Sequence, residues 1–517
     1  MAPATELSPD VVSRLRGWFD DTDLVSPSIN YAVFDRSGIL FQNGVGEFQL
    51  DGRSPGPDTV YRIASMSKSF CIAAVLVLRD RGLLSLEDRV ASLVPEFHDP
   101  VDEDGVTLPV TVRMLMSNSS GLPEDNGWAD HELALSRDDF LAVVAAGLGF
   151  AGLPGTGFQY SNVGFWLLGV IVENLAGMGF ERFAAETFLE PLGLHHTKYR
   201  PEDYPDSGET GDGIAHGFTS YDKGASWVSR PVVGGGIGAC AASMFSTVGD
   251  IARWSAWLSS AFDPTNDDDA ILSRASRREM QRIHTVAPGA ADRTTTPPLE
   301  AQGYGLGLYV EHDVRFGRFA QHSGGLPGWS SNMRWHLESG IGAVVFGNTN
   351  GLKLGVAATG MLRAVLEAQG EPARRMRPWP ATIAAARAID AVFLGSGRIH
   401  DAEVAPTIFS PNLLSDVPAE VRDDRLAKLA AEIGGVLDAA GTPPLEDRLV
   451  WAVAPSHLAW SIPGRNGELE CRIELTPTTP PMLQRVDIVK RSPTTALSPV
   501  LRHYRPESSI LPLTPRA

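Results

Sequence analysis

Cysteine is scarce in this 517-residue chain. Its three cysteines, Cys71, Cys240 and Cys471, are far apart, odd in number and set among apolar residues. This pattern fits neither a disulfide framework nor a zinc site, and it predicts free buried thiols in a reducing compartment. His195 and His196 are adjacent rather than one helical turn apart, which argues against a metal site. We therefore expect neither a metal nor a cofactor.

Positive charge and long apolar runs are lacking as well. The chain has 44 lysines and arginines against 62 aspartates and glutamates, a net charge of −18, whereas nucleic acids and anionic membranes bind basic patches. No apolar run reaches the ~20 residues that cross a bilayer. The first residues, MAPATELSPDVVSRLRGWFDD, lack the basic start and apolar core of a signal peptide. We expect a cytoplasmic protein with neither nucleic acid nor membrane as a partner, and its oligomeric state stays open.

The segment YRIASMSKSFCIAAVLVLRDRGLLS, residues 61–85, is predicted to form a short strand, a sharp bend and a helix that is apolar on nearly all sides. Ser65 and Lys68 stand at the bend and in the first helical turn, and residues three apart share a helix face. The Lys68 amine can therefore reach the Ser65 hydroxyl, and burial would lower the lysine pKa. This predicts a serine nucleophile with a lysine base. The alternative is a helix N-cap beside a solvated lysine.

Two similar patterns elsewhere lack the necessary context. Ser220 and Lys223 repeat the serine–lysine spacing, but they lie in the polar stretch HGFTSYDKGAS, with no buried helix. Gly52-Arg53-Ser54-Pro55-Gly56 fits the nucleophile-elbow pattern. That elbow needs an oxyanion N–H from the residue after the serine, and Pro55 has none. We interpret both as chance matches.

Tyr160-Ser161-Asn162 stands where a loop enters a predicted buried helix near Val163. A phenol and an amide two residues apart in a tight loop can point the same way. The alternative is a turn in which the tyrosine packs on the core and the asparagine caps the helix.

His322-Ser323-Gly324 ends a predicted strand directly before Gly325. The histidine could bind a substrate carboxylate or steady other catalytic groups, and Gly325 could bring its backbone N–H close to a ligand. The alternative is a strand histidine paired with a backbone carbonyl.

The order of predicted elements indicates an α/β (α+β) fold. A capped helix near residues 8–19 and a hairpin at 28–46 precede a run of helices, and an antiparallel meander near 304–347 follows with a closing helix. This predicts an antiparallel sheet flanked by helices, with a helical lobe inserted. The expected domains are 1–370, a proline- and arginine-rich linker at 371–382, and a small α+β domain at 383–517 without a catalytic constellation.

The three motifs in this order resemble the penicillin-recognising serine hydrolases. That family includes class C β-lactamases, D-Ala-D-Ala carboxypeptidases, D-aminopeptidases and esterases. The resemblance covers roughly residues 10–370 and includes phrases such as LMSNSSGLP and PGTGFQYSN. It implies a β-lactamase/transpeptidase-like fold with the site between the sheet and the helical lobe. The second domain looks cystatin-like, a helix against a curved sheet.

Carried onto this sequence, the resemblance implies that Ser65 is the acylated nucleophile and Lys68 its base or proton shuttle. Tyr160 would help to activate Ser65 and later the hydrolytic water. Asn162 would contact the substrate amide, and the N–H groups of Ser65 and Gly325 would form the oxyanion hole. Ser323 and Gly324, on the same strand as Gly325, would also bind substrate.

One departure from the family pattern bears on the substrate. The family often has lysine where His322 stands, so a permanent cation is replaced by a group that is charged only near or below pH ~6.5. This favours an esterase or D-amino-acid peptidase over a dedicated β-lactamase. We predict a serine hydrolase acting on a small ester, amide or short-peptide acyl substrate. The alternatives are a β-lactamase or carboxypeptidase, a peptidyl cyclase or acyltransferase, and a non-catalytic sensor or scaffold.

Overall fold

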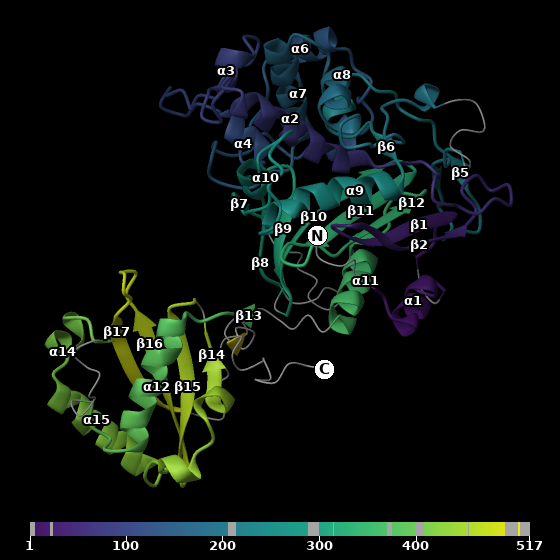
Figure 1. Cartoon of the computed structure of the whole chain (residues 1–517). Helices are drawn as coiled ribbons and strands as arrows, with labels where there is room; N and C mark the ends of the chain where they lie inside the picture. Colours follow the sequence, from purple (N-terminus) through teal and green to yellow (C-terminus); the bar gives the residue numbers. More distant parts are fainter. Residues whose placement is uncertain are drawn as a thin grey trace. The chain divides into compact units, whose positions relative to one another are not determined.

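The computed structural model describes residues 6–20, 24–204, 213–287, 299–313, 315–369, 375–399, 408–452, 454–491 and 505–506. The chain divides into two compact units (Figure 1). The first comprises residues 1–313 and 317–371, and the second comprises residues 314–316 and 372–517.

An antiparallel sheet forms the centre of the first unit. Within the described residues it has eight strands in the order β2-β1-β12-β11-β10-β9-β8-β7. Their bounds are β1 Ser28–Asp35, β2 Gly38–Gly46, β7 Thr285–Val286, β8 Leu299–Tyr304, β9 Tyr309–Asp313, β10 Gly317–Leu326, β11 Trp329–His336 and β12 Gly342–Gly347. The hairpin β1–β2 closes the meander because β1 pairs with β12, with Tyr31 opposite Val345. The predicted antiparallel sheet is confirmed.

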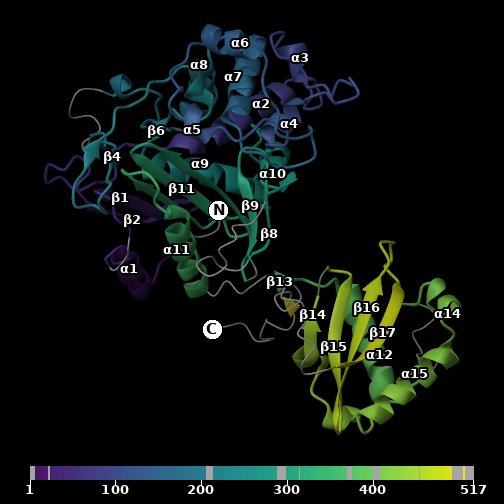
Figure 2. The same cartoon turned by 180° about the vertical axis from the view of Figure 1, so that it is seen from behind.

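Helices cover both faces of this sheet. α9 (Val248–Ser259) packs on one face, and α11 (Leu354–Ala368) packs on the other together with α1 (Pro9–Arg16), as Figures 1 and 2 show from opposite sides. β1, β11 and β12 are buried along their whole length. In β11 this burial includes polar side chains, namely Ser330, Ser331, Asn332, Arg334 and His336. The sheet is therefore a central layer.

The helical lobe lies next to α9 and contains most of the remaining helices. They are α2 (Lys68–Asp80), α3 (Val90–Leu93), α4 (Val112–Met116), α5 (Asn126–Ala129), α6 (Arg137–Ala145), α7 (Asn162–Ala176), α8 (Phe180–Ala184) and α10 (Arg274–Met280). α2 and α7 are buried nearly all round and pack against each other. Among the described residues no single helix has the length and apolarity to cross a membrane, although α7 with the stretch 180–189, bent by 76°, meets that test by length and composition.

Hydroxyl side chains fix where several of these helices begin. Ser8, Thr111, Ser136, Ser161 and Thr247 are N-caps whose side chains accept a hydrogen bond from a backbone N–H two or three residues into the helix. The predicted capped helix that begins near Ser8 is confirmed. The alternative interpretation, in which Asn162 caps α7, is wrong, because Ser161 is the N-cap.

The second unit is built on a four-stranded antiparallel sheet. Its strands are β14 (Leu449–Trp451), β15 (His457–Gly464), β16 (Gly467–Leu475) and β17 (Leu483–Arg491), and its main helices are α12 (Pro380–Leu394), α14 (Asn412–Asp416) and α15 (Ala419–Glu432). The segment 371–382 is not a plain linker. β13 (Arg375–Met376) pairs with β18 (Arg505–Pro506), and α12 begins at Pro380, which pre-sets the φ of a first helical residue. Residues 371–374 lie outside the described part.

Candidate active site

Ser65 is placed by a strained turn between strand and helix. The short strand β3 (Tyr61–Arg62) leads into a 3-10 turn, Ala64–Ser67, that runs directly into α2. Ala64 has a φ of +49°, a region that residues with a Cβ rarely occupy. The turn leaves Ser65 8% exposed, at the edge of a cavity of about 740 Å³. The predicted strand, bend and apolar helix are confirmed.

Lys68 lies beneath Ser65 and is fully buried. Its Nζ is 3.2 Å from the Ser65 hydroxyl, 2.6 Å from Asn162 Oδ1 and 3.3 Å from the Ala241 carbonyl oxygen. Burial lowers the lysine pKa to about 8, although nearby carboxylates, first of all Asp125, oppose this shift. The carbonyl oxygens of Asn162 and Ala241 can only accept. A neutral amine therefore donates its two N–H groups to them and turns its lone pair toward the Ser65 hydroxyl.

Asn162 differs from the expectation that it contacts substrate. It is 1% exposed, and its Oδ1 accepts from Lys68. Its Nδ2 donates to Asp125 Oδ1 and Asn126 Oδ1, each at 2.9 Å. Every polar atom of the side chain is thus engaged inside the protein. Asn162 orients the Lys68 amine.

Asp125 fixes the N-terminal end of α7, where Asn162 lies, and was not foreseen from the sequence. Its carboxylate accepts from the backbone N–H groups of Asn162 and Val163, at 2.8 and 2.9 Å, and from the Ser161 hydroxyl at 2.9 Å. A carboxylate at a helix N-terminus is favoured by the unpaired N–H groups there. The contact joins the loop before α5 to α7, 37 residues later, and no local pattern signals it.

Tyr160 lies close to both Ser65 and Lys68. Its ring centre is 5.0 Å from Lys68 Nζ. Burial raises the pKa of Tyr160, and a hydrogen bond with the Ser65 side chain only partly offsets that effect. The side chain is therefore a neutral phenol at physiological pH. Of the two groups beside Ser65, the lysine is the one that can lose its proton there.

His322 is neutral and held on both ring nitrogens. It is 1% exposed, and burial, together with the charge of Lys68, lowers its pKa to about 3. The Ser323 carbonyl oxygen, 2.6 Å from Nδ1, can only accept, so Nδ1 carries the proton and Nε2 accepts from the Tyr304 hydroxyl at 3.2 Å. The expected role in binding a substrate carboxylate is therefore corrected. The structure instead matches the alternative interpretation, a strand histidine paired with a carbonyl.

Gly324 and Gly325, which follow on the same strand, differ in the space around them. A Cβ on Gly324 would lie 2.2 Å from both the Ile63 carbonyl oxygen and Ser331 Oγ, whereas a Cβ on Gly325 would meet nothing within 4 Å. Gly324 therefore lets β10 pack directly against the turn that holds Ser65. Gly325 faces the cavity, as does the exposed Ser323, whose hydroxyl oxygen accepts from Asn332 Nδ2 at 2.9 Å.

Three charged side chains also line the cavity, and none was foreseen. They are Glu124, Asp130 and Arg230. Burial raises the pKa of Asp130 to about 6, against the opposing charge of Lys68. Arg230 Nε is buried, and no described residue hydrogen-bonds or ion-pairs with its guanidinium. A buried acid and an unpaired guanidinium in one cleft are features of a binding site.

Neither of the two chance motifs has the local structure of a serine nucleophile. Ser54 is exposed in an irregular loop, without the strand-to-helix turn of a nucleophile elbow. Ser220 and Lys223 are separated from any helix, and the Ser220 hydroxyl donates to Asp222 at 2.8 Å. The rejection of both motifs is confirmed. Within the described residues no cluster of three or more histidine, cysteine, aspartate or glutamate side chains could hold a metal ion.

A family model described as "Beta-lactamase" matches residues 21–367. The chain therefore belongs to the β-lactamase family. Among curated relatives, it is 27% identical to penicillin-binding protein 4* of Bacillus subtilis over 321 residues, 58% of this chain and 63% of that protein. It is 24% identical to protein flp of Staphylococcus aureus over 330 residues, 63% of this chain and 60% of that one. The chain thus spans somewhat under two thirds of these relatives' length.

Solved structures show the same fold. An octameric penicillin-binding protein homologue from Pyrococcus abyssi is 19% identical with a TM-score of 0.56, covering 90% of this chain and 95% of that chain. EstCE1, a hydrolase with promiscuous acyltransferase activity, is 19% identical with a TM-score of 0.54, covering 69% and 97%. A D-stereospecific amidohydrolase from Streptomyces sp. is 21% identical with a TM-score of 0.51, covering 69% and 97%. The predicted family and β-lactamase/transpeptidase-like fold are confirmed.

Proposed function

We propose that the protein is a serine hydrolase that acts through an acyl-enzyme on Ser65. The observation that carries this proposal is the Lys68 amine, fully buried with a pKa near 8 and 3.2 Å from the hydroxyl of a serine at the edge of a cavity. An ordinary surface lysine stays protonated and cannot accept a proton. A buried one near neutrality can act as a general base.

In the proposed reaction the neutral Lys68 amine takes the Ser65 proton as Oγ attacks the acyl carbon. The oxyanion accepts hydrogen bonds from the N–H groups of Ser65 and Gly325. Lys68, with the Tyr160 phenol as relay, returns the proton to the leaving oxygen or nitrogen as its bond to the acyl carbon breaks. Water then attacks the acyl-enzyme and its proton passes to Lys68. Lys68 returns this proton to Ser65 Oγ as the bond between Oγ and the acyl carbon breaks, which releases the acid and restores the free enzyme.

The proposed substrates are small esters, amides or D-amino-acid peptides. A cavity of about 740 Å³ is in the range of small-molecule sites. The neutral His322 supplies no permanent cation at its own position, whereas Arg230 lines the cavity as a cation. The acidic chain favours such a substrate over nucleic acid. Transfer of the acyl group to an amine is a second candidate, since one structural neighbour is described as a hydrolase with promiscuous acyltransferase activity.

A fluorophosphonate probe tests the proposal directly. We expect it to label Ser65, and we expect labelling to disappear in Ser65→Ala and persist in Ser54→Ala. Loss of labelling in Ser54→Ala alone would contradict the assignment. Rates on a short-chain nitrophenyl ester, a D-amino-acid anilide and a chromogenic cephalosporin then separate esterase, peptidase and β-lactamase. Acylation without turnover of any of them would instead support a sensor.

A further inference from the structure

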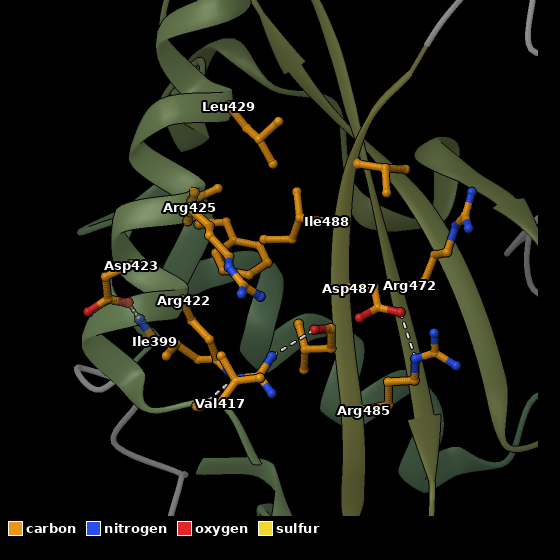
Figure 3. Close-up of a pocket in the computed structure, with 14 residues that line it drawn as sticks. Ile399, Val417, Arg422, Asp423, Arg425, Leu429, Arg472, Arg485, Asp487 and Ile488 are labelled. Atoms are coloured by element: carbon orange, nitrogen blue, oxygen red, sulfur yellow. Dashed lines mark hydrogen bonds and ion pairs between the residues drawn. The ribbon is translucent and has the colours of Figure 1, made fainter. Parts of the chain in front are cut away.

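A second cavity, of about 390 Å³, lies within the second unit between α15 and the sheet strands β16 and β17. Figure 3 shows it in close-up, with Leu429 and Ile488 facing each other across the gap. Its volume is within the ~300–1,000 Å³ of small-molecule sites. It is formed by this unit alone, and no step of the proposed hydrolysis uses it.

The walls of this cavity combine apolar and charged residues. The apolar ones are Phe393, Ile399, Val417, Leu426, Leu429, Val486, Ile488 and Val489. Phe393, Ile399, Leu426 and Val486 are almost fully buried, so the cavity reaches into the hydrophobic core of the unit. Such a surface favours a hydrocarbon body over a polar one.

The charged groups at this cavity carry a positive excess. Four arginines line it against two aspartates, in a protein whose net charge is −18. Arg485 is paired with Asp487, at 2.6 Å, and Arg472 with Glu470, at 2.8 Å. Asp423 accepts from the Ile399 backbone N–H at 2.6 Å. These groups are satisfied without a ligand.

Arg422 and Arg425 are not neutralised in this way. The Arg422 guanidinium donates to the carbonyl oxygens of Val417, Val486 and Leu413, at 3.1, 2.9 and 2.9 Å, which fixes its position but leaves its charge. Arg425 has no hydrogen-bond or ion-pair partner among the described residues, and its guanidinium points from α15 across the gap toward the sheet (Figure 3). Burial lowers the pKa of Arg422, while the charge of Asp487 opposes this shift and the charge of Arg425 adds to it. The charge that the described residues leave unpaired at this cavity is therefore that of Arg425.

We propose that this cavity binds a small amphipathic carboxylate, with its hydrocarbon body between Leu429 and Ile488 and its carboxylate on Arg425. A guanidinium presents parallel N–H donors that match a carboxylate. The site is separate from the Ser65 cavity and does not depend on the proposed hydrolysis.

Calorimetric titration of the full-length protein with decanoate tests the site. We expect saturable binding, with decanol and decylamine binding at least about tenfold more weakly because they lack the anionic head. Arg425→Gln should weaken decanoate binding by about tenfold. Lys428→Gln removes one positive charge from the same helix without touching the cavity and serves as the matched control, with an expected change of less than about twofold.

Leu429→Trp tests the cavity itself, since a larger side chain should fill it and abolish binding while circular dichroism stays that of the wild type. Arg230→Gln, in the other cavity, should leave decanoate binding unchanged. The proposal is overturned if decanoate does not bind, if decanol binds equally well, if Arg425→Gln behaves like Lys428→Gln, or if only Arg230→Gln weakens binding. Because no outcome depends on turnover, failure here is distinct from failure of Ser65 labelling.

Discussion

At the residue scale, burial decides which side chain beside Ser65 acts as the base. The same loss of water raises the pKa of Tyr160 and lowers the pKa of Lys68 to about 8. Burial therefore moves the pKa of the phenol further from pH 7 and the pKa of the amine closer to pH 7. The reaction should carry the signature of an amine that works in its neutral form.

We predict that kcat/KM on a nitrophenyl ester rises with pH along a limb centred near pH 8. The fraction of neutral Lys68 grows as pH increases through its pKa, so activity is lost on the acid side. Lys68→Arg keeps a cation that does not deprotonate, and we expect activity to fall at least about 100-fold. Stopped-flow rates between pH 6 and pH 10 measure the limb. A flat profile over this range would rule out Lys68 as the base.

Arg230 gives a prediction about substrate charge. Its unpaired guanidinium lines the Ser65 cavity, so it should favour acyl groups that carry a free carboxylate. We expect Arg230→Gln to lower kcat/KM about tenfold on the nitrophenyl ester of a dicarboxylic half-acid and to leave a neutral ester of equal length unchanged. Lys223→Gln, an exposed lysine in the neighbouring loop, is the control. An equal loss of kcat/KM on both esters would show that Arg230 supports the structure of the cavity and does not recognise the substrate carboxylate.

At the element scale, the site depends on how closely β10 and β11 approach the turn before α2. Ser331 Oγ, on β11, donates to the Ile63 carbonyl at 2.8 Å, and these two oxygens leave no room for a side chain at Gly324 of β10. This contact joins parts of the chain more than 250 residues apart. It fixes Ser65 relative to Gly325, the two proposed oxyanion donors.

We predict that Gly324→Ala destabilises the first unit by on the order of 3 kcal/mol and abolishes labelling of Ser65, because its Cβ would press into backbone and hydroxyl oxygens. Gly325→Ala is the matched control. Its Cβ meets open space, so we expect a change within about 0.5 kcal/mol. Urea unfolding and labelling rates measure the two effects. Equal stability of the two variants would contradict the close packing of β10.

A feature could be predicted from the sequence when the residues that interact are close together along the chain. Ser8 was recognisable as a cap because its side chain accepts from a backbone N–H only three residues away. The serine–lysine pair was visible because one helical turn joins its members.

Side chains brought together from distant segments gave no such signal. Asp125 reaches Asn162 and Val163, and Asp130 and Arg230 meet only across the cavity. Their spacing in the sequence is set by the whole fold. For the same reason the neutral state of His322 could not be foreseen, since it results from burial against Tyr304 and the charge of Lys68.

At the scale of the whole molecule, the two units have separate hydrophobic cores. One surrounds α2, α7 and the larger sheet, and the other includes Ile389, Trp460 and Cys471. All three cysteines are free and buried, as predicted. The buried Lys68 belongs to the first core, and its titration therefore affects the unfolding of that unit.

Lys68 should make the stability of the protein depend on pH in a defined window. Its pKa is about 8 in the folded protein, against 10.5 for an ordinary lysine. Between these values the unfolded chain binds a proton that the folded chain has released, so the free energy of unfolding increases with pH there. Below pH 8 the full cost of burying the charged amine remains.

We therefore predict that the wild type gains about 2 kcal/mol of unfolding free energy relative to Lys68→Met when pH is raised from 7 to 9.5. Urea unfolding of both proteins, followed by the fluorescence of the first unit, measures the difference at each pH. The comparison cancels other titrating groups, because the methionine variant retains them. A difference that is independent of pH would mean that Lys68 keeps its ordinary pKa in the fold, and it would remove the general base on which the proposed reaction depends.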